Sequence, residues 1–160
     1  MLIPFEELAP HSRIWVYQAN RLLSAEDQQH IHDAATQFLS GWQAHGKDLR
    51  SSFSIAYDQF LIIGVDEQYN MATGCSIDAS VHLIKNLEQS LGLNFFDRMQ
   101  IPFLQEGKVS LLPMQQIPAQ VEAGTLNPDS LTFNNLVKNK AEFDSNWKVA
   151  AKDSWLSRYF

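Results

Sequence analysis

The stretch from Gln59 to Gly92 constrains the fold of this chain most strongly. It begins with Phe60 to Val65, an apolar run that is rich in β-branched residues and too short to span a membrane. Such a run predicts a strand that is buried on both faces. After an irregular connection, apolar residues recur at helical spacing from Cys75 to Leu91, and Gly92 stands where a helix C-cap is expected. We therefore expect a strand, a loop and a helix to form one core unit.

Three elements are expected before this unit. Along Ser12 to Gln18 the side chains alternate between two faces, and both faces carry apolar residues. This pattern predicts a central strand. Ser24 is suited to cap a helix, with a buried stripe of apolar residues that ends at Trp42. The apolar residues Phe53, Ile55 and Tyr57 alternate with polar residues, which predicts a half-exposed strand.

A strand is also expected after the unit, at Met99 to Leu104, where Pro102 points to a sheet edge. The resulting order β-α-β-β-α-β predicts an α+β fold with a ferredoxin-like core, an antiparallel four-stranded sheet with two helices on one face. We expect a single domain over residues 1–160, with a core at about 12–112 and a C-terminal extension at about 113–160 that wraps the core.

The extension carries weaker signals. We expect its last residues, including Trp155 and Phe160, to dock on the body of the protein. An undocked tail with so many apolar side chains would be unfavourable in water. The other elements expected in this half of the chain are a strand at Val109–Leu112, a short helix at Pro118–Ala123, a strand at Leu131–Phe133 and a helix at Lys140–Trp147.

Composition excludes several classes of function. The net charge of −6, with basic residues scattered singly, argues against general binding of nucleic acid or anionic lipid. A lone cysteine excludes an intrachain disulfide and a cysteine-based zinc site. The first residues, Met1 to Glu7, have no basic region and no signal-peptide core, and no apolar run approaches the roughly 18 residues of a membrane span. We expect a soluble cytoplasmic protein without a cofactor or a metal.

Gly41 to Asp48 comes close to the phosphate-binding pattern G-x-x-x-x-G-K-[ST]. That loop joins a strand to a following helix and supplies a hydroxyl to magnesium, whereas here Asp48 replaces the hydroxyl and the segment follows a helix. A helix C-cap and loop is the favoured interpretation, and an ATPase is disfavoured.

Cys75 is the candidate catalytic residue, because the N-terminus of a helix can stabilise a thiolate. The favoured alternative is a small buried cysteine that lets the loop pack against the sheet. His82 is the one histidine near it, and no cation is close in sequence.

The connection from Asp66 to Gly74 is the expected place for a ligand, because it is longer than most such joints and ends at free helix N–H groups. It could instead pack Tyr69 and Met71 over the core, and Thr73 or Ser76 could serve as a helix cap. A divalent cation is a weaker option. The ligand-binding candidates are Asp66, Glu67, Thr73, Gly74, Cys75, Ser76 and Asp78.

The chain also resembles a family of small uncharacterised bacterial proteins that often carry the name "ABC transporter ATPase". The resemblance spans essentially the whole chain and implies a complete protein, but it supplies no catalytic residues, and the Walker and transporter signature motifs are missing. The sequence segments on which the resemblance rests are Ser12–Gln18, Ala44–Gly46, Val65–Glu67, Ala72–Asp78, Phe133–Val137 and Ser154–Trp155.

These observations favour a ligand-binding or assembly module over an enzyme. The first alternative is a thiol-dependent or small-molecule enzyme that uses Cys75 and the Asp66–Asp78 loop. The expected partner is a small molecule or a protein, which includes a second copy of this chain.

Overall fold

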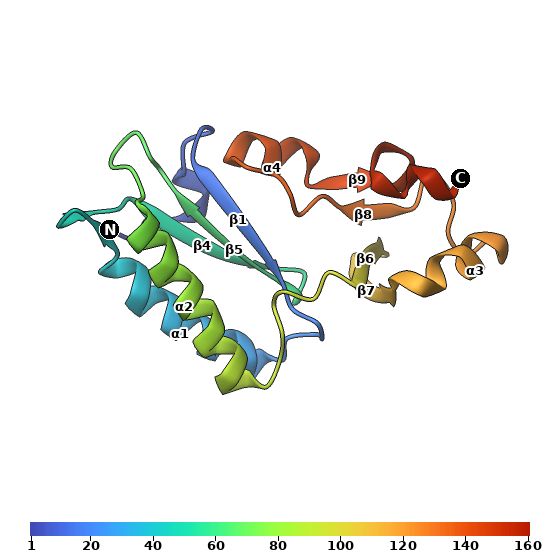
Figure 1. Ribbon diagram of the computed structural model, residues 1–160, viewed down its shortest axis with the longest axis horizontal. Helices are drawn as coiled ribbons and strands as arrows, with labels where there is room; N and C mark the ends of the chain where they lie inside the picture. The colour runs from blue at the N-terminus through green and yellow to red at the C-terminus, as the bar shows by residue number, and fades with distance from the viewer.

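The computed structural model describes all residues from 1 to 160 and has an α+β architecture with antiparallel sheets (Figure 1). The first sheet contains β1 (Arg13–Gln18), β4 (Ser51–Ala56) and β5 (Phe60–Val65), and the second contains β6 (Gln100–Gln105), β7 (Lys108–Pro113), β8 (Leu131–Phe133) and β9 (Lys148–Ala150). The α-helices are α1 (Ala25–Ser40), α2 (Gly74–Leu91), α3 (Ile117–Glu122) and α4 (Lys140–Asn146). Short 3₁₀ helices lie at Phe5–Glu7, Met114–Gln116, Ala151–Asp153 and Trp155–Tyr159. None of the helices combines the length and the apolar character that crossing a membrane requires.

The first sheet is built around β5. Its strand order is β1-β5-β4, and every residue of β5 is buried. On one face, Leu61, Ile63 and Val65 belong to the core cluster that includes residues of α1 and α2, and Figure 1 shows both helices on the same side of the sheet. The prediction that this strand is apolar on both faces is confirmed.

Local sequence signals set the ends of the two long helices. Ser24 caps α1 in a capping box with Asp27, and Thr73 caps α2 in the same way with Ser76. Gly92 ends α2 in the left-handed conformation with φ of 63°, which glycine adopts without steric cost. The predicted helix positions are therefore confirmed.

The C-terminal half of the chain covers the opposite face of the first sheet. Phe60 of β5 lies with its ring centroid 4.8 Å from that of Phe133 and 5.0 Å from that of Trp147. Ile62 and Val137 belong to the same buried cluster. This aromatic contact fixes β8 and the end of α4 against the centre of the first sheet.

The predicted ferredoxin-like sheet differs from the observed topology at its fourth strand. In that arrangement, residues 100–105 would lie beside β1, whereas they form β6 between β7 and β8 in the second sheet. A tight turn at Glu106 and Gly107 pairs β6 with β7, and Ile101 and Phe103 bury their side chains against Ile117 and Leu156. The C-terminal residues thus supply a second core that the sequence pattern did not reveal.

The expectation that Pro102 marks a sheet edge is also wrong, because β6 is an inner strand. The ladder between β6 and β8 pairs only Phe103 and Leu104 of β6. Pro102 lies just outside it, and its carbonyl oxygen instead accepts a hydrogen bond from Thr132 Oγ1 at 2.7 Å. An inner strand therefore tolerates the missing N–H at this position.

Residues Gly41 to Asp48 form a hairpin. Gly41 ends α1, and β2 (Gln43–Ala44) pairs with β3 (Lys47–Asp48). His45 and Gly46 have positive φ values of 53° and 73°, which are typical of a two-residue hairpin turn. The segment does not have the strand–loop–helix geometry of a phosphate-binding loop.

The C-terminal tail docks through a residue that the sequence analysis did not single out. Leu156 is buried in the second core, whereas Trp155 and Phe160 are exposed. The expectation that these two aromatic side chains carry the docking is therefore wrong. Docking through Leu156 leaves Trp155 at the surface between the two sheets.

Candidate functional site

The acidic side chains at the start of the Asp66–Asp78 loop are bound to neighbouring groups. Asp66 Oδ1 lies 2.8 Å from His11 Nε2 and also accepts the N–H of Gln68 at 3.0 Å. Partial burial acts to raise the pKa of Asp66, but the hydrogen bonds from His11 and Gln68 outweigh it, so the pKa is lowered. Glu67 accepts the N–H of Ala72 at 3.1 Å, which closes the loop on itself.

The remaining loop candidates lie at the start of α2. Thr73 and Ser76 are engaged in the capping box, while Gly74, Cys75 and Asp78 are exposed. The interpretation of Cys75 as a buried packing residue is therefore wrong, because its thiol lies at the surface. No group of three or more His, Cys, Asp and Glu side chains is placed to hold a metal ion together. A ligand site in this loop stays a prediction.

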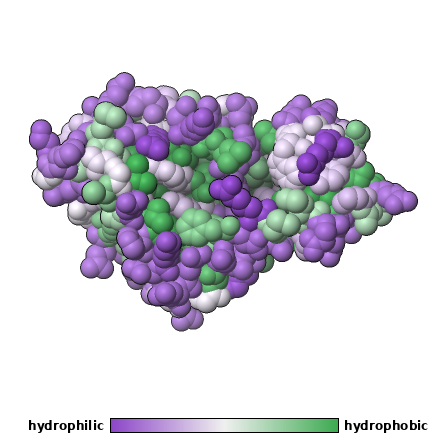
Figure 2. Space-filling view, viewed as in Figure 1, coloured by the Kyte–Doolittle hydropathy of each residue, from purple (hydrophilic) through white to green (hydrophobic).

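A different site lies between the two sheets. A cleft of about 1160 Å³ opens where the end of β1 faces the second sheet, and its lining residues lie within four stretches of the chain, 16–18, 95–102, 132–137 and 142–155. In the space-filling view, hydrophobic residues gather at the surface where the two parts of the molecule meet (Figure 2). The lining side chains include Gln18, Phe96, Arg98, Gln100, Thr132, Asn134, Asn135, Leu136, Asn146, Lys148, Ser154 and Trp155.

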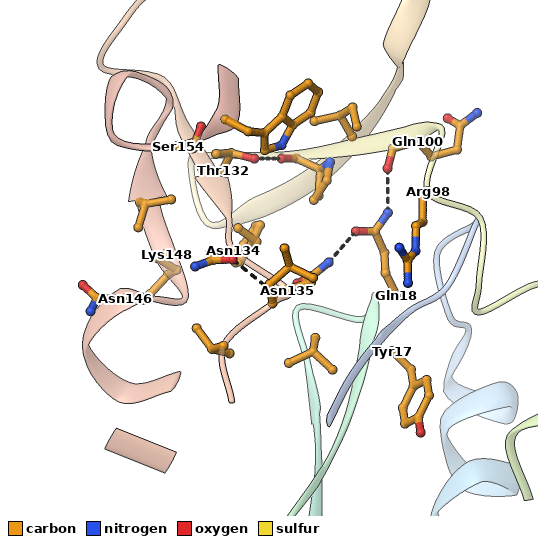
Figure 3. A pocket seen from close by; sticks show the side chains of 18 of the residues that line it. Tyr17, Gln18, Arg98, Gln100, Thr132, Asn134, Asn135, Asn146, Lys148 and Ser154 are labelled. Carbon is orange, nitrogen blue, oxygen red and sulfur yellow. Dashed lines mark hydrogen bonds between the residues drawn. The ribbon is translucent and has the colours of Figure 1, made fainter. Parts of the chain in front are cut away.

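Side-chain amides form a connected chain across the cleft (Figure 3). Asn135 Nδ2 donates to Gln18 Oε1 at 3.0 Å, and Gln18 Nε2 donates to the carbonyl oxygen of Gln100 at 2.9 Å. The indole N–H of Trp147 donates to Asn135 Oδ1 at 2.9 Å. Each of these bonds holds an amide in one orientation, so the donors and acceptors of the cleft wall are fixed before anything binds.

The outer edge of β1 forms one wall. Antiparallel pairing with β5 uses the odd-numbered residues, as the bond from Ala19 N–H to Gln59 O shows, so the even-numbered residues point their backbone groups outward. Ile14 N–H donates to Lys138 O at 3.0 Å, which closes one end of this edge. No backbone partner meets the outward groups of Val16, and a smaller cleft of about 490 Å³ lies beside it.

Exposed apolar side chains surround these polar groups. Phe96, Leu136 and Trp155 line the cleft and are 46%, 77% and 45% exposed. Phe96 packs edge-on against Tyr17, whose ring centroid is 5.9 Å away. Burial raises the pKa of the Tyr17 phenol, and a hydrogen bond with Ser80 offsets part of that effect. The phenol therefore stays neutral at physiological pH.

The charges of the cleft are mixed. Arg98 is exposed and takes part in no ion pair within the chain. Lys148 lies over the ring of Tyr57, 5.8 Å from its centroid. Asp97, Glu142 and Asp153 also contribute to the lining. Such a surface suits a ligand that presents hydrogen-bonding groups and apolar groups. A highly charged ligand fits it less well.

Sequence reasoning missed this site because its residues are far apart in the chain. Asn134 and Asn135 do belong to a phrase, Phe133–Val137, that the resemblance highlighted, and a pair of amides between apolar residues was the available signal. The comparisons with family models, with curated proteins and with solved structures returned no match to this chain.

Proposed function

We propose that this protein is a binding module and that its ligand occupies the cleft between the two sheets. The observation that carries the proposal is the amide chain from Asn135 through Gln18 to Gln100, next to exposed Phe96, Leu136 and Trp155. Binding sites commonly combine an apolar lining with a few fixed polar groups that orient the ligand.

The position of the cleft supports the same proposal. One wall is β1 of the first sheet, and the other comes from β6, β8 and β9 of the second. A ligand in this place would touch both sheets, and its binding free energy would add to the contact made by Phe133 and Trp147. Ligand binding should therefore stabilise the arrangement of the two sheets.

The chemistry of the lining narrows the class of ligand. Asn and Gln side chains both donate and accept hydrogen bonds, so they match amides, hydroxyls and carbonyls. The carboxylates of Asp97, Glu142 and Asp153 disfavour a nucleic acid backbone. A small molecule or a protein segment with neutral polar groups is the class that fits.

A thermal-shift screen of metabolites, nucleotides and peptides against the full chain tests this proposal. A ligand at 100 times its Kd should stabilise the fold by about 2.7 kcal/mol. Leu136→Asp should remove the shift, because Leu136 lines the cleft, whereas Leu22→Asp should keep it, because Leu22 is exposed and lies outside the cleft. Equal loss of the shift in both variants would contradict the proposal.

Thiol chemistry at Cys75 is the second candidate, and the exposure of its side chain at the start of α2 favours it. Reaction with a thiol reagent at pH 6, compared with free cysteine, tests it. A rate well above that of free cysteine would support a stabilised thiolate. An equal rate would rule against thiol chemistry and leave ligand binding as the remaining candidate function.

A cytoplasmic location and membership of the resembled family are further proposals that rest on the sequence. The single cysteine, which can form no intrachain disulfide, supports the first. The phrases from Ser12–Gln18 to Ser154–Trp155 support the second.

A further inference from the structure

We infer that the occupant of the cleft is an extended polypeptide segment, which pairs with the outer edge of β1 at Val16 and Gln18. This inference rests on the proposed function, because it names the ligand class for the same cleft. It goes beyond that function by assigning the recognition to backbone groups of a strand.

The two ends of the outer edge are already bonded to polypeptide backbone. At one end, Ile14 N–H donates to Lys138 O, and Lys140 N–H donates to Ser12 O at 2.8 Å. At the other end, Asn20 N–H donates to Asn94 O at 2.9 Å. These bonds show that the even-numbered residues of β1 present their N–H and C=O groups outward, ready for a strand partner.

Between these ends the edge is open. β1 pairs in a ladder only with β5, and the outward backbone groups of Val16 and Gln18 have no partner. Val16 is half-buried and Gln18 is buried, and both residues line the cleft, so this stretch of the edge lies inside the cleft. Unpaired groups in such a setting favour a ligand that supplies the missing hydrogen bonds.

Another polypeptide strand supplies donors and acceptors at the spacing of these groups. Val16 and Gln18 are two residues apart, which is about 7 Å along a strand, and an added strand alternates its own N–H and C=O groups with the same period. This match in spacing favours a peptide.

The side chains around the edge fit the same ligand. Phe96, Leu136 and Trp155 are exposed and line the same cleft, so an added strand could contact them with its side chains. We therefore expect the bound segment to carry apolar residues at alternate positions.

The outer edge of β4 provides an internal control. Its backbone groups point outward at the odd-numbered residues, as the bond from Ser51 N–H to Met1 O shows, and Phe53 and Ile55 are open in the same way. Neither residue lines the cleft. A peptide that binds in the cleft should protect the amides of Val16 and Gln18 from hydrogen exchange and leave those of Phe53 and Ile55 unprotected.

The test is a selection of peptides from a random phage-displayed library on the full chain, followed by hydrogen exchange and an N-methyl scan of a selected peptide. Methylation of a peptide nitrogen removes its N–H, so strand pairing predicts that alternate positions weaken binding about tenfold or more while those between do not. Val16→Pro should also abolish binding, because it removes an outward donor, while Val16→Thr should retain binding.

Several outcomes would overturn the inference. They are a selection without binders, binders that leave the Val16 and Gln18 amides unprotected, and N-methyl effects without alternation. Self-association of the free protein through this edge would overturn it in favour of a second copy. If Val16→Pro fails to fold, the N-methyl scan with the unaltered protein still tests whether the peptide pairs with β1 as a strand. Small molecules that bind the cleft while peptides do not would sink this inference and leave the proposed function standing.

Discussion

Asn135 and Gln18 are 117 residues apart in the chain, yet their side-chain amides meet at 3.0 Å. This hydrogen bond joins the C-terminal half of the protein to β1 and sets one corner of the cleft. The same Asn135 side chain accepts the indole N–H of Trp147, so one amide ties the aromatic core to the candidate site.

Asn135→Ala should lower the free energy of unfolding by about 1–3 kcal/mol, because it leaves the buried Trp147 N–H and the Gln18 Oε1 without partners. Urea denaturation measures the change. Asn146→Ala is the matched control, since Asn146 is exposed at the same cleft, and we expect a change within about 0.5 kcal/mol. Equal effects of the two substitutions would show that the amide chain contributes nothing to stability.

Gly64→Ala should destabilise the protein by about 1–3 kcal/mol through overpacking. A Cβ at this position would lie 2.5 Å from Leu8 Cδ1 and 2.9 Å from Ile14 Cδ1, so both side chains would have to move. Gly74→Ala is the control, because nothing lies within 4 Å of its added Cβ. Thermal unfolding of the two variants distinguishes them, and an unchanged Gly64→Ala protein would refute the close packing of Leu8 and Ile14 around Gly64 of β5.

Leu156→Ala should cost about 2–5 kcal/mol, because Leu156 is 1% exposed in the second core. Trp155→Ala should change the stability little, since its ring is half exposed, but it should weaken a ligand of the cleft. Denaturation curves of both variants provide the measurement. A larger loss of stability from Trp155→Ala than from Leu156→Ala would be inconsistent with the observed docking of the tail.

Stability should fall in acid as Asp27 is protonated. Hydrogen bonds from Arg21 and from the backbone N–H of Ser24 lower the pKa of Asp27 to about 2, below its value in the unfolded chain. The contribution of Asp27 is thus present above about pH 4 and is lost as the pH falls towards 2. Urea unfolding at several pH values should show a shallower acid dependence for Asp27→Asn, and curves of identical slope would argue against this role.

Much of the fold follows from local sequence. The apolar faces of Ser12–Gln18 and Phe60–Val65 identified two neighbouring strands of the first sheet. Only β5 is central, and the prediction of a central strand at Ser12–Gln18 is wrong, because the expected fourth strand pairs in the second sheet and leaves β1 at the edge. Ser24 and Gly92 marked helix ends through capping chemistry. These signals lie within a few residues of the structure that they determine. They depend on backbone conformation and burial, and the residue types and spacing within one short segment indicate both.

The partner of β6 could not be found in this way. The pattern from Met99 to Leu104 predicts a strand, but an apolar strand can pair with any open edge, and β8 comes from much later in the chain. The cleft was missed for the same reason, because the Gln18–Asn135 contact depends on where β8 docks. Burial of Cys75 was misjudged because its helix turns that position towards solvent.

The central claim, that the cleft between the sheets is the binding site, is tested most directly by an NMR titration of ¹⁵N-labelled protein with the strongest ligand from the thermal-shift screen. The account predicts that the side-chain amide signals of Gln18, Asn134 and Asn135 shift and saturate together. Shifts confined to the loop from Asp66 to Asp78, with those amide signals unchanged, would contradict it.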